Sequence, residues 1–297
     1  MTAHRTARCR AWVVPAAVTA VLLLSGCGHG QQQQGTYASG GDPGQGPITL
    51  GADHSPESRV VAALYEKLLT DAGEQVTLAR SSYASPADTA KAVVTGRLTL
   101  APAYETTLLR ALGSTSSIPG DIGGTLSMVL PVGITALPPA AAQHGPVIAV
   151  SRATARHHDL RSLADLADTH RRFTLGGPAA GASQAPSAGT LSAAYGVPLT
   201  PVGTSGPADL QVLRGTDPAI ARDGLVVLTD PKGVIPPDHV FPLIGSDYAG
   251  KATRTALARL DTTLTTGQLA LLASAVTNGQ SPDQAATAWL RAKGMLA

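Results

Sequence analysis

The sequence predicts an α/β fold in two lobes. Two runs of alternating strand and helix patterns, separated by irregular segments, indicate two sheets that are covered by helices. The length of 297 residues suits one or two ordinary domains with a sizeable core. Hydrophobic residues make up 43% of the chain and charged residues only 14%, which excludes a largely disordered, highly charged chain.

The first run of elements lies between residues 48 and 112. Its first two helices carry start and stop signals, because Ser55 and Ser85 each stand directly before a proline, as an N-cap does, and a glycine follows each helix. The expected elements are a strand at 48–50, a helix from Ser55 to Gly73, a strand at 75–79, a helix from Ser85 to Gly96, a strand at 98–101 and a helix at 105–112. This order of alternating strands and helices predicts a parallel sheet.

The second run follows an extended stretch that is expected at 126–137. Its expected elements are a strand at 147–151, a helix at 159–168 with Ser162 as its cap, a strand at 173–175, a helix at 190–195, a strand at 225–228, and closing helices at 248–260, 267–276 and 282–293. The irregular segments 126–146 and 229–243 are expected to connect the lobes. The expected domains are lobe 1 (48–137 and 229–297) and lobe 2 (138–228), with a ligand in the cleft at the carboxyl ends of the strands.

Residues 1–27 have the pattern of a secretory leader. Arginines within the first ten residues precede an apolar run at 11–24, which is shorter than a typical membrane span. The run ends in Leu24-Ser25-Gly26-Cys27, which resembles a bacterial lipobox. The thiol of Cys27 would then carry diacylglycerol. Two other interpretations of this segment are an ordinary signal peptide with a chance cysteine and a short membrane anchor.

Cysteine usage agrees with a lipid-anchored protein. Cys9 and Cys27 are the two cysteines, and both lie in the leader, so processing would leave Cys27 alone. The mature domain is therefore expected to have no disulfide, no cysteine-based metal site and no cysteine nucleophile. Residues 28–47 are rich in Gln, Gly, Ser and Pro and predict a flexible tether, which would hold the domain at the outer face of the bacterial cytoplasmic membrane.

The charge balance argues against nucleic acid as a partner. The formal net charge is +2, but Arg5, Arg8 and Arg10 lie in the leader, so the remaining chain has 19 basic residues against 20 acidic ones. A near-neutral body lacks the basic surface that binds a phosphate backbone. Aromatic residues, at 3%, are also too few for a base-stacking surface.

No motif in the sequence supports catalysis. The chain has neither a phosphate-binding loop nor a His-Glu-x-x-His pattern, and residues 181–185 lack the final glycine of a nucleophile elbow. His157 and His158 are adjacent, so they would point apart on a regular element, and a solvated turn before Asp159 is expected there. We therefore expect a protein that is not an enzyme. A surface hydrolase that brings Ser, His and Asp together by folding is the alternative, and no motif favours it.

Several stretches resemble one family of transport proteins. They are Gly51–Glu57, Leu100–Tyr104, Thr216–Ile220, Leu225–Gly233 and Phe241–Leu243. With the leader and the two lobes, they resemble a divergent glycine betaine/choline (osmoprotectant) ABC-transporter substrate-binding lipoprotein over residues 46–297. The resemblance implies a periplasmic-binding-protein-like fold of type II, with a mixed sheet flanked by helices in each lobe. It also implies closure of the lobes on a small solute, delivery to the permease and ATPase subunits of an importer, and no cofactor or metal.

The resemblance places the ligand site but changes its chemistry. The family holds quaternary ammonium ligands in a cage of aromatic rings, and Tyr104 here matches one tyrosine of its strand-end turn, whereas Ala101 stands at the other. The residues directly before Val147 and directly before Thr216 include no Phe, Tyr or Trp, and residues 181–189 lack the arginine that the resemblance implies. The candidate ligand-binding residues are Asp53, His54, Tyr104, Glu105, Thr216 and Asp217. These side chains predict a polar, acidic cleft for a cationic or hydroxyl-rich solute.

Two alternatives to this interpretation stay open. Tyr83 and Tyr248 are other sources of rings, although they are expected on the surface or in packing. The chain is also compatible with a sensor or scaffold lipoprotein that retains the fold with a degenerate site. Genes for a permease and an ATPase beside its own gene would favour transport over that alternative.

Overall fold

The computed structural model describes residues 46–113, 121–182 and 184–296. The predicted signal peptide with Cys27, and the predicted tether up to residue 45, lie outside the described residues. In the described part of the chain, no helix combines the length and the apolar character that crossing a bilayer requires. The same residues contain no group of three or more His, Cys, Asp or Glu side chains that is arranged to hold a metal ion.

The first sheet is mixed and has the strand order β2-β1-β3-β10-β4. Its strands are β1 (Ile48–Leu50), β2 (Val76–Leu78), β3 (Leu100–Tyr104), β4 (Ile134–Ala136) and β10 (Val240–Gly245). Strand β1 pairs in parallel with β2 and β3, whereas β10 runs antiparallel to both β3 and β4. The first sheet therefore contains strands that precede the second sheet in the sequence, β1 to β4, and one strand that follows it, β10.

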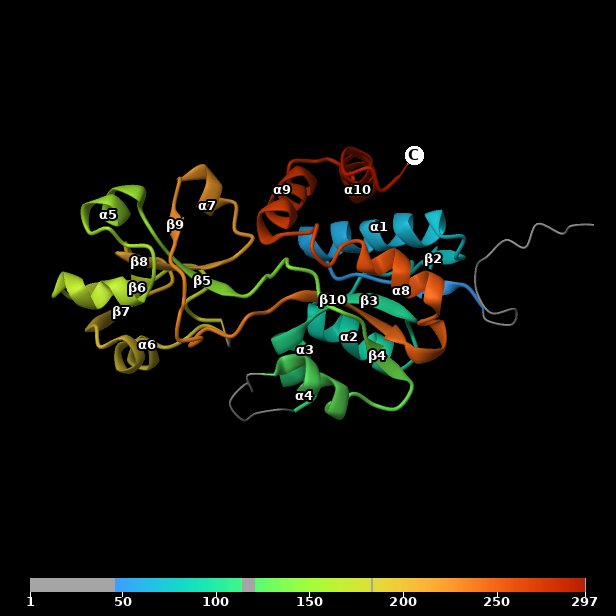
Figure 1. Cartoon of the computed structure of the whole chain (residues 1–297), viewed down its shortest axis with the longest axis horizontal. Helices are drawn as coiled ribbons and strands as arrows, with labels where there is room; N and C mark the ends of the chain where they lie inside the picture. The colour runs from blue at the N-terminus through green and yellow to red at the C-terminus, as the bar shows by residue number, and fades with distance from the viewer. Residues whose placement is uncertain (1–45, 114–120, 183, 297) are drawn as a thin grey trace, which may run out of the picture. The chain divides into compact units, whose positions relative to one another are not determined.

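Helices cover both faces of this sheet (Figure 1). One face is covered by α1 (Pro56–Asp71), α8 (Lys251–Ala258), α9 (Thr266–Thr277) and α10 (Pro282–Ala292), and the other by α2 (Pro86–Val94), α3 (Glu105–Ala111) and α4 (Ile122–Val129). Successive side chains of a strand point to opposite faces. Accordingly, Val240 and Ile244 of β10 pack under α1, α8, α9 and α10, in what we call the first core. Phe241 and Leu243 pack on the opposite face, under α2, α3 and α4.

The second sheet is also mixed and has the order β7-β6-β8-β5-β9. Its strands are β5 (Pro146–Val150), β6 (Phe173–Gly176), β7 (Leu199–Gly203), β8 (Leu210–Arg214) and β9 (Val226–Val227), and its helices are α5 (Arg152–His157), η1 (Ala164–Thr169), α6 (Ala188–Tyr195) and α7 (Ala219–Arg222). Strand β6 is parallel to β7 and β8, and β5 is antiparallel to β8 and β9. One buried cluster around Phe173, Ile148 and Val212 forms its core.

The two sheets share one plan. In each, three parallel strands lie in the order second-first-third, and an antiparallel strand from a crossing segment, β10 or β5, follows. The chain passes from one sheet to the other between β4 and β5 and returns between β9 and β10. The predicted fold class, two mixed sheets flanked by helices, is confirmed.

Two of the expected elements are placed wrongly by the sequence. The extended stretch expected at 126–137 is helical at its start, because α4 runs to Val129 and the Asp121 side chain accepts a hydrogen bond from Gly124 N–H at its first turn. The helix expected at 159–168 is only the 3-10 helix η1, and the α-helix lies earlier, at α5, with Ser151 as its N-cap. Helices this short show too little periodicity for the pattern to locate them.

Prolines conceal some of the strands that the sequence misses or shortens. Strand β10 falls largely in the segment expected to be an irregular crossing, and β3 extends past its predicted end at Ala101 to Tyr104. Pro242 and Pro102 lie opposite each other in the β3–β10 register, and Pro201 lies in β7. Because proline has no N–H to donate, a sequence pattern that contains it argues against a strand.

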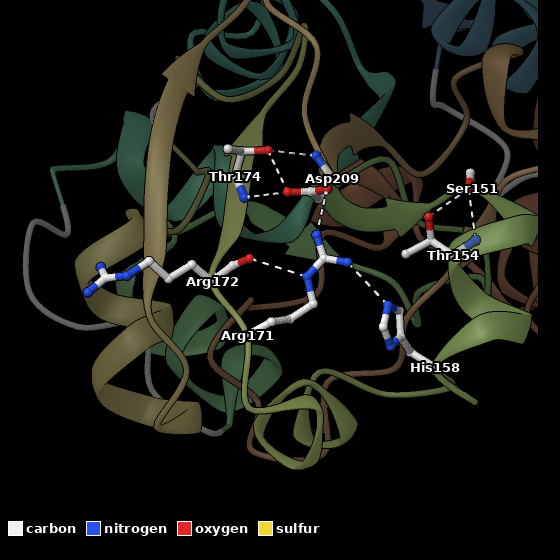
Figure 2. A network of polar contacts seen from close by, with 7 residues as sticks. All are labelled: Ser151, Thr154, His158, Arg171, Arg172, Thr174 and Asp209. Carbon is white, nitrogen blue, oxygen red and sulfur yellow. Dashed lines mark hydrogen bonds and ion pairs between the residues drawn. The ribbon is translucent and has the colours of Figure 1, made fainter.

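A polar network ties two strands of the second sheet together at their starts (Figure 2). Asp209 Oδ2 accepts hydrogen bonds from the N–H and the hydroxyl of Thr174, each at 2.8 Å, and Asp209 Oδ1 lies 3.3 Å from Arg171 Nη2. Arg171 also contacts His158 Nε2 at 3.1 Å and lies over the Phe173 ring. Burial would raise the pKa of Asp209, but the Thr174 hydrogen bonds and the Arg171 charge outweigh it and lower that pKa.

Candidate functional site

A cavity of about 580 Å³ is lined by residues that come from both sheets. The first sheet contributes the turn after β1, the start of α2 and the β3–α3 junction, and the second contributes the end of β8 and the loop after β6. The polar lining residues used below are Asp53, Tyr104, Thr107, His144, Gln184 and Arg214. A cavity of this size accommodates a small molecule.

Asp53 is held in the turn between β1 and α1. Its backbone N–H donates to Ser58 Oγ at 3.2 Å, and its Oδ1 accepts from the N–H of Ser55, the N-cap of α1, at 2.8 Å. The residue is only 2% exposed. Its second carboxyl oxygen, Oδ2, is buried and has no hydrogen-bond partner. The start of α1 therefore fixes the Asp53 side chain and leaves one strong acceptor unused.

Tyr104 ends β3 and is 1% exposed. Its hydroxyl is also buried without a hydrogen-bond partner. Burial raises the pKa of Tyr104 well above its usual value, and the nearby carboxylates of Asp53, Glu57 and Asp238 raise it further. The phenol therefore stays neutral and presents a hydroxyl that can donate or accept.

His144 stands beside Tyr104, with 5.3 Å between the ring centroids. His144 Nδ1 lies 2.8 Å from Thr216 Oγ1, and the Thr216 hydroxyl donates to Glu57 Oε1 at 2.9 Å. Since the Thr216 proton goes to Glu57, its oxygen is free to accept from Nδ1–H. Burial lowers the pKa of His144, the Glu57 charge opposes this shift, and Arg214 reinforces it. A neutral ring in this tautomer leaves Nε2 as an acceptor.

Asp238 forms a second, fully bonded carboxylate close to the same wall. It is 1% exposed, and it accepts hydrogen bonds from Thr106 N–H at 2.8 Å, Thr107 N–H at 3.3 Å, Thr107 Oγ1 at 2.9 Å and Gln184 Nε2 at 2.9 Å. We call Asp238, Thr106, Thr107 and Gln184 the Asp238 cluster. Gln184 follows β6, whereas the threonines belong to α3, so this cluster joins the two sheets.

The predicted site residues are distributed over several places. Asp53 and Tyr104 line the cavity, and Thr216 contacts it through His144. His54 instead lines a neighbouring hollow of about 540 Å³, which Asp53 also borders, and its Nδ1 lies 2.9 Å from Ser82 Oγ. Glu105 pairs with His239 Nδ1 at 2.9 Å, and Asp217 Oδ1 accepts a hydrogen bond at 2.8 Å from the N–H of Ala219, the first residue of α7.

Four of the polar cavity residues were missed by reasoning from the sequence, namely Thr107, His144, Gln184 and Arg214. Arg214 ends β8, a strand that was not predicted, so nothing indicated that it reaches the cavity. His144 stands in the sequence where the resembling family has a tyrosine, and its imidazole packs against Tyr104. Gln184 lies in the stretch 181–189, where the resemblance implies an arginine and the sequence has none. For Thr107, the polar Glu-Thr-Thr start of α3 is the signal in the sequence that could have indicated a hydrogen-bonding role.

The other tyrosines of the described chain do not complete a cage around Tyr104. Tyr83 pairs through its backbone with Asp53, and Arg97 lies 5.8 Å from its ring. Tyr248 packs against the first core, and Tyr195 donates a hydrogen bond to Asp230. Within the described residues, Tyr104 and His144 are the rings that line the cavity.

Comparisons with known proteins were made for the sequence and for the structure. A family model described as the substrate binding domain of ABC-type glycine betaine transport system matches residues 46–292. The ligand-free YehZ protein of Escherichia coli has a similar structure, with 20% identity, a TM-score of 0.67 and coverage of 84% of this chain and 100% of that one. A glycine betaine/carnitine/choline ABC transporter structure has 17% identity, a TM-score of 0.71 and coverage of 84% and 99%. A comparison with curated protein sequences gives no match.

Proposed function

The chain belongs to the family of substrate-binding domains of ABC-type glycine betaine transport systems, and from this premise we propose that it binds a small polar solute in the Asp53–Tyr104 cavity and delivers it to a permease. The family resemblance inferred from the sequence motifs is confirmed by the match over residues 46–292. This is a family of transport proteins and not of enzymes. The two similar structures, at 17% and 20% identity, support the fold.

One observation carries the proposal of a bound solute. Asp53 Oδ2 and the Tyr104 hydroxyl are both buried and unpartnered, and both residues line the same cavity. Leaving a buried polar group unsatisfied costs about 1–3 kcal/mol. A solute that bonds to both groups would remove this cost, so the pair is suited to ligand binding rather than to structural support. The proposed ligand-binding residues are Asp53 and Tyr104, with Thr216 positioning His144.

Delivery to a permease requires a difference between the loaded and the empty protein. The proposed lobes, 48–137 with 229–297 and 138–228, are connected by the segments between β4 and β5 and between β9 and β10. A solute that contacts both lobes stabilises the closed arrangement and shifts the population toward it. The importer's permease would recognise that closed form, and its ATPase would power release.

We place the protein at the outer face of the bacterial cytoplasmic membrane. Proteins of this family serve importers and act outside the cytoplasm. The proposed signal peptide ends at Cys27, whose lipid would anchor the chain, and residues 28–47 would form the tether. Membrane fractionation of a Cys27→Ser variant tests the anchor: the variant should leave the membrane fraction, and one that stays there would contradict the proposal.

A thermal-shift screen of the full chain, purified in mild detergent, tests the solute-binding function. A ligand that binds the native state raises its melting temperature. The screen should cover amines, zwitterions, polyols, sugars and aromatic acids at millimolar concentration. At least one class should raise the melting temperature in the wild type and not in an Asp53→Asn, Tyr104→Phe double variant. No shift with any class would contradict solute binding and would favour the sensor or scaffold alternative.

A further inference from the structure

We infer that the cavity selects a small zwitterion whose cationic end carries N–H donors, a primary, secondary or tertiary ammonium, in preference to a quaternary ammonium. This inference rests on the proposed function and concerns the chemical class of its solute. It depends on three features of the cavity: the acceptors that are left unpartnered, the number of rings, and the sign of the charge on each wall.

The unpartnered acceptor is the first feature. Asp53 Oδ2 is buried and receives no hydrogen bond, whereas Oδ1 is already used by Ser55 N–H. An ammonium N–H would supply both the missing hydrogen bond and an opposite charge. A quaternary ammonium has no N–H, so it would cover this oxygen with methyl groups and leave it unbonded. The Tyr104 hydroxyl, also unpartnered, would lose its chance of a bond in the same way.

The supply of aromatic rings is the second feature. A cation that cannot donate hydrogen bonds is held by several ring faces around it. In the described chain, this cavity offers only the rings of Tyr104 and His144, whose centroids lie 5.3 Å apart and whose planes are tilted by 40° to each other. The cavity therefore offers more hydrogen-bonding capacity than ring surface to a cation.

The charges on the two walls are the third feature. The first sheet's wall carries Asp53 and also Arg110, which has a partner of its own, and Arg214, at the end of β8, belongs to the second sheet's wall. No carboxylate of the described residues forms an ion pair with the Arg214 guanidinium. A cation alone would leave Arg214 without a counter-charge, and an anion alone would leave Asp53 without one. A zwitterion satisfies both walls and also bridges the two sheets.

Isothermal titration of the full chain in detergent tests the inference. The probes are the N-methylation series glycine, N-methylglycine, N,N-dimethylglycine and glycine betaine, in which N–H donors fall stepwise to none. Matched pairs of larger size, proline with its N,N-dimethyl betaine and γ-aminobutyrate with its N-trimethyl betaine, allow for a longer solute. In the best-fitting size class, loss of the last N–H should weaken binding about tenfold or more.

Variants assign this preference to the residues named. Asp53→Asn should reduce the ratio between the N–H-bearing and the quaternary member toward unity, and Tyr104→Phe should reduce it in part. Arg214→Gln should weaken zwitterions and leave the ratio unchanged, because the guanidinium serves the other end of the solute. Matched controls lie outside the cavity: Asp217→Asn before α7, Tyr248→Phe beside the first core, and Arg222→Gln at an arginine that pairs with Asp223. Circular dichroism confirms that each variant is folded.

The outcomes separate this inference from the proposed function. Tighter binding of the quaternary member in every size class would overturn the inference and leave solute transport intact. Binding of sugars or polyols alone, with no ammonium compound bound, would overturn it in the same way. If neither the ammonium compounds nor the sugars and polyols bind, both the inference and the proposed function are contradicted. Tighter binding of an N–H-bearing zwitterion, lost in Asp53→Asn and retained in Asp217→Asn, supports both.

Discussion

One buried aspartate, Asp53, lines the cavity and a second, Asp238, lies close to it, and their surroundings differ in the hydrogen bonds they offer. Asp238 is 1% exposed and accepts four hydrogen bonds, which use both carboxyl oxygens. Asp53 is 2% exposed, and its Oδ2 receives none. Burial alone therefore does not distinguish a structural carboxylate from one that is reserved for a ligand. The unused acceptor is the feature that distinguishes them.

The Asp238 cluster should dominate stability, so its loss is the largest expected effect. Asp238→Ala removes the acceptor of two backbone N–H groups, the Thr107 hydroxyl and the Gln184 amide together. We expect a loss of about 3 kcal/mol in the free energy of unfolding, because buried donors without partners are costly. Urea denaturation measures it. A loss no greater than that of Asp53→Ala would break the comparison between the two aspartates.

Asp53→Asn should have little effect on the same measurement. The substitution is nearly isosteric, keeps an oxygen that can accept from Ser55 N–H, and removes a buried charge that has no partner. The free energy of unfolding should stay within about 1 kcal/mol of wild type, or rise. A loss as large as that of Asp238→Asn, measured in parallel, would show that Asp53 is a structural residue.

Gln184→Ala separates the contact between sheets from the rest of the Asp238 cluster. Gln184 donates to Asp238 Oδ2, and Thr106 and Thr107 keep their own bonds to Asp238 without it. The expected loss is about 1.5–2 kcal/mol, because Gln184 Nε2 donates to the charged Asp238 Oδ2 and also to Thr107 Oγ1. Urea denaturation against Gln280→Ala, an exposed control, measures it. An effect equal to that of Asp238→Ala would show that the bonds from Thr106 and Thr107 to Asp238 add no stability without Gln184.

The Arg171–Asp209 network of the second sheet should have a small effect on stability that depends on pH. The pKa of Asp209 is lowered in the folded protein, so its contribution is present above the unfolded pKa and is lost as the pH falls through the folded one. The group is partly exposed, so we expect less than about 1 kcal/mol. The stability of wild type and Asp209→Asn, compared between pH 6 and pH 3, should converge at low pH. A constant difference would contradict this origin.

The elements that the sequence predicts well are those with local signals. Ser55 and Ser85 cap α1 and α2 as their Ser-Pro pairs indicate, since capping depends on neighbours within one turn. Strands β3 and β10 were shortened or missed because their prolines oppose each other in a central pair, an arrangement that only the register reveals. Tertiary pairing decides such strands, and local propensity does not.

The candidate site shows the same division. Asp53 and Tyr104 were found because motifs mark them, and they line the cavity. Arg214, His144 and Gln184 were not found, since they reach the cavity from β8, a crossing segment and a loop. Asp217 was included as an acidic residue of the Thr216–Ile220 motif, yet its carboxyl group accepts a hydrogen bond from Ala219 N–H at the start of α7. Adjacent side chains on an irregular segment often point to different parts of the structure and make different contacts.

Titration of the strongest solute from the thermal-shift screen into Asp53→Asn and Asp217→Asn tests the central claim most directly. Both variants lose one carboxylate that the sequence marked, but only Asp53 lines the cavity with an unused oxygen. Asp53→Asn should weaken the Kd about tenfold or more, and Asp217→Asn should leave it within about twofold of wild type. Equal effects of the two substitutions, or none from Asp53→Asn, would contradict a solute site at this cavity.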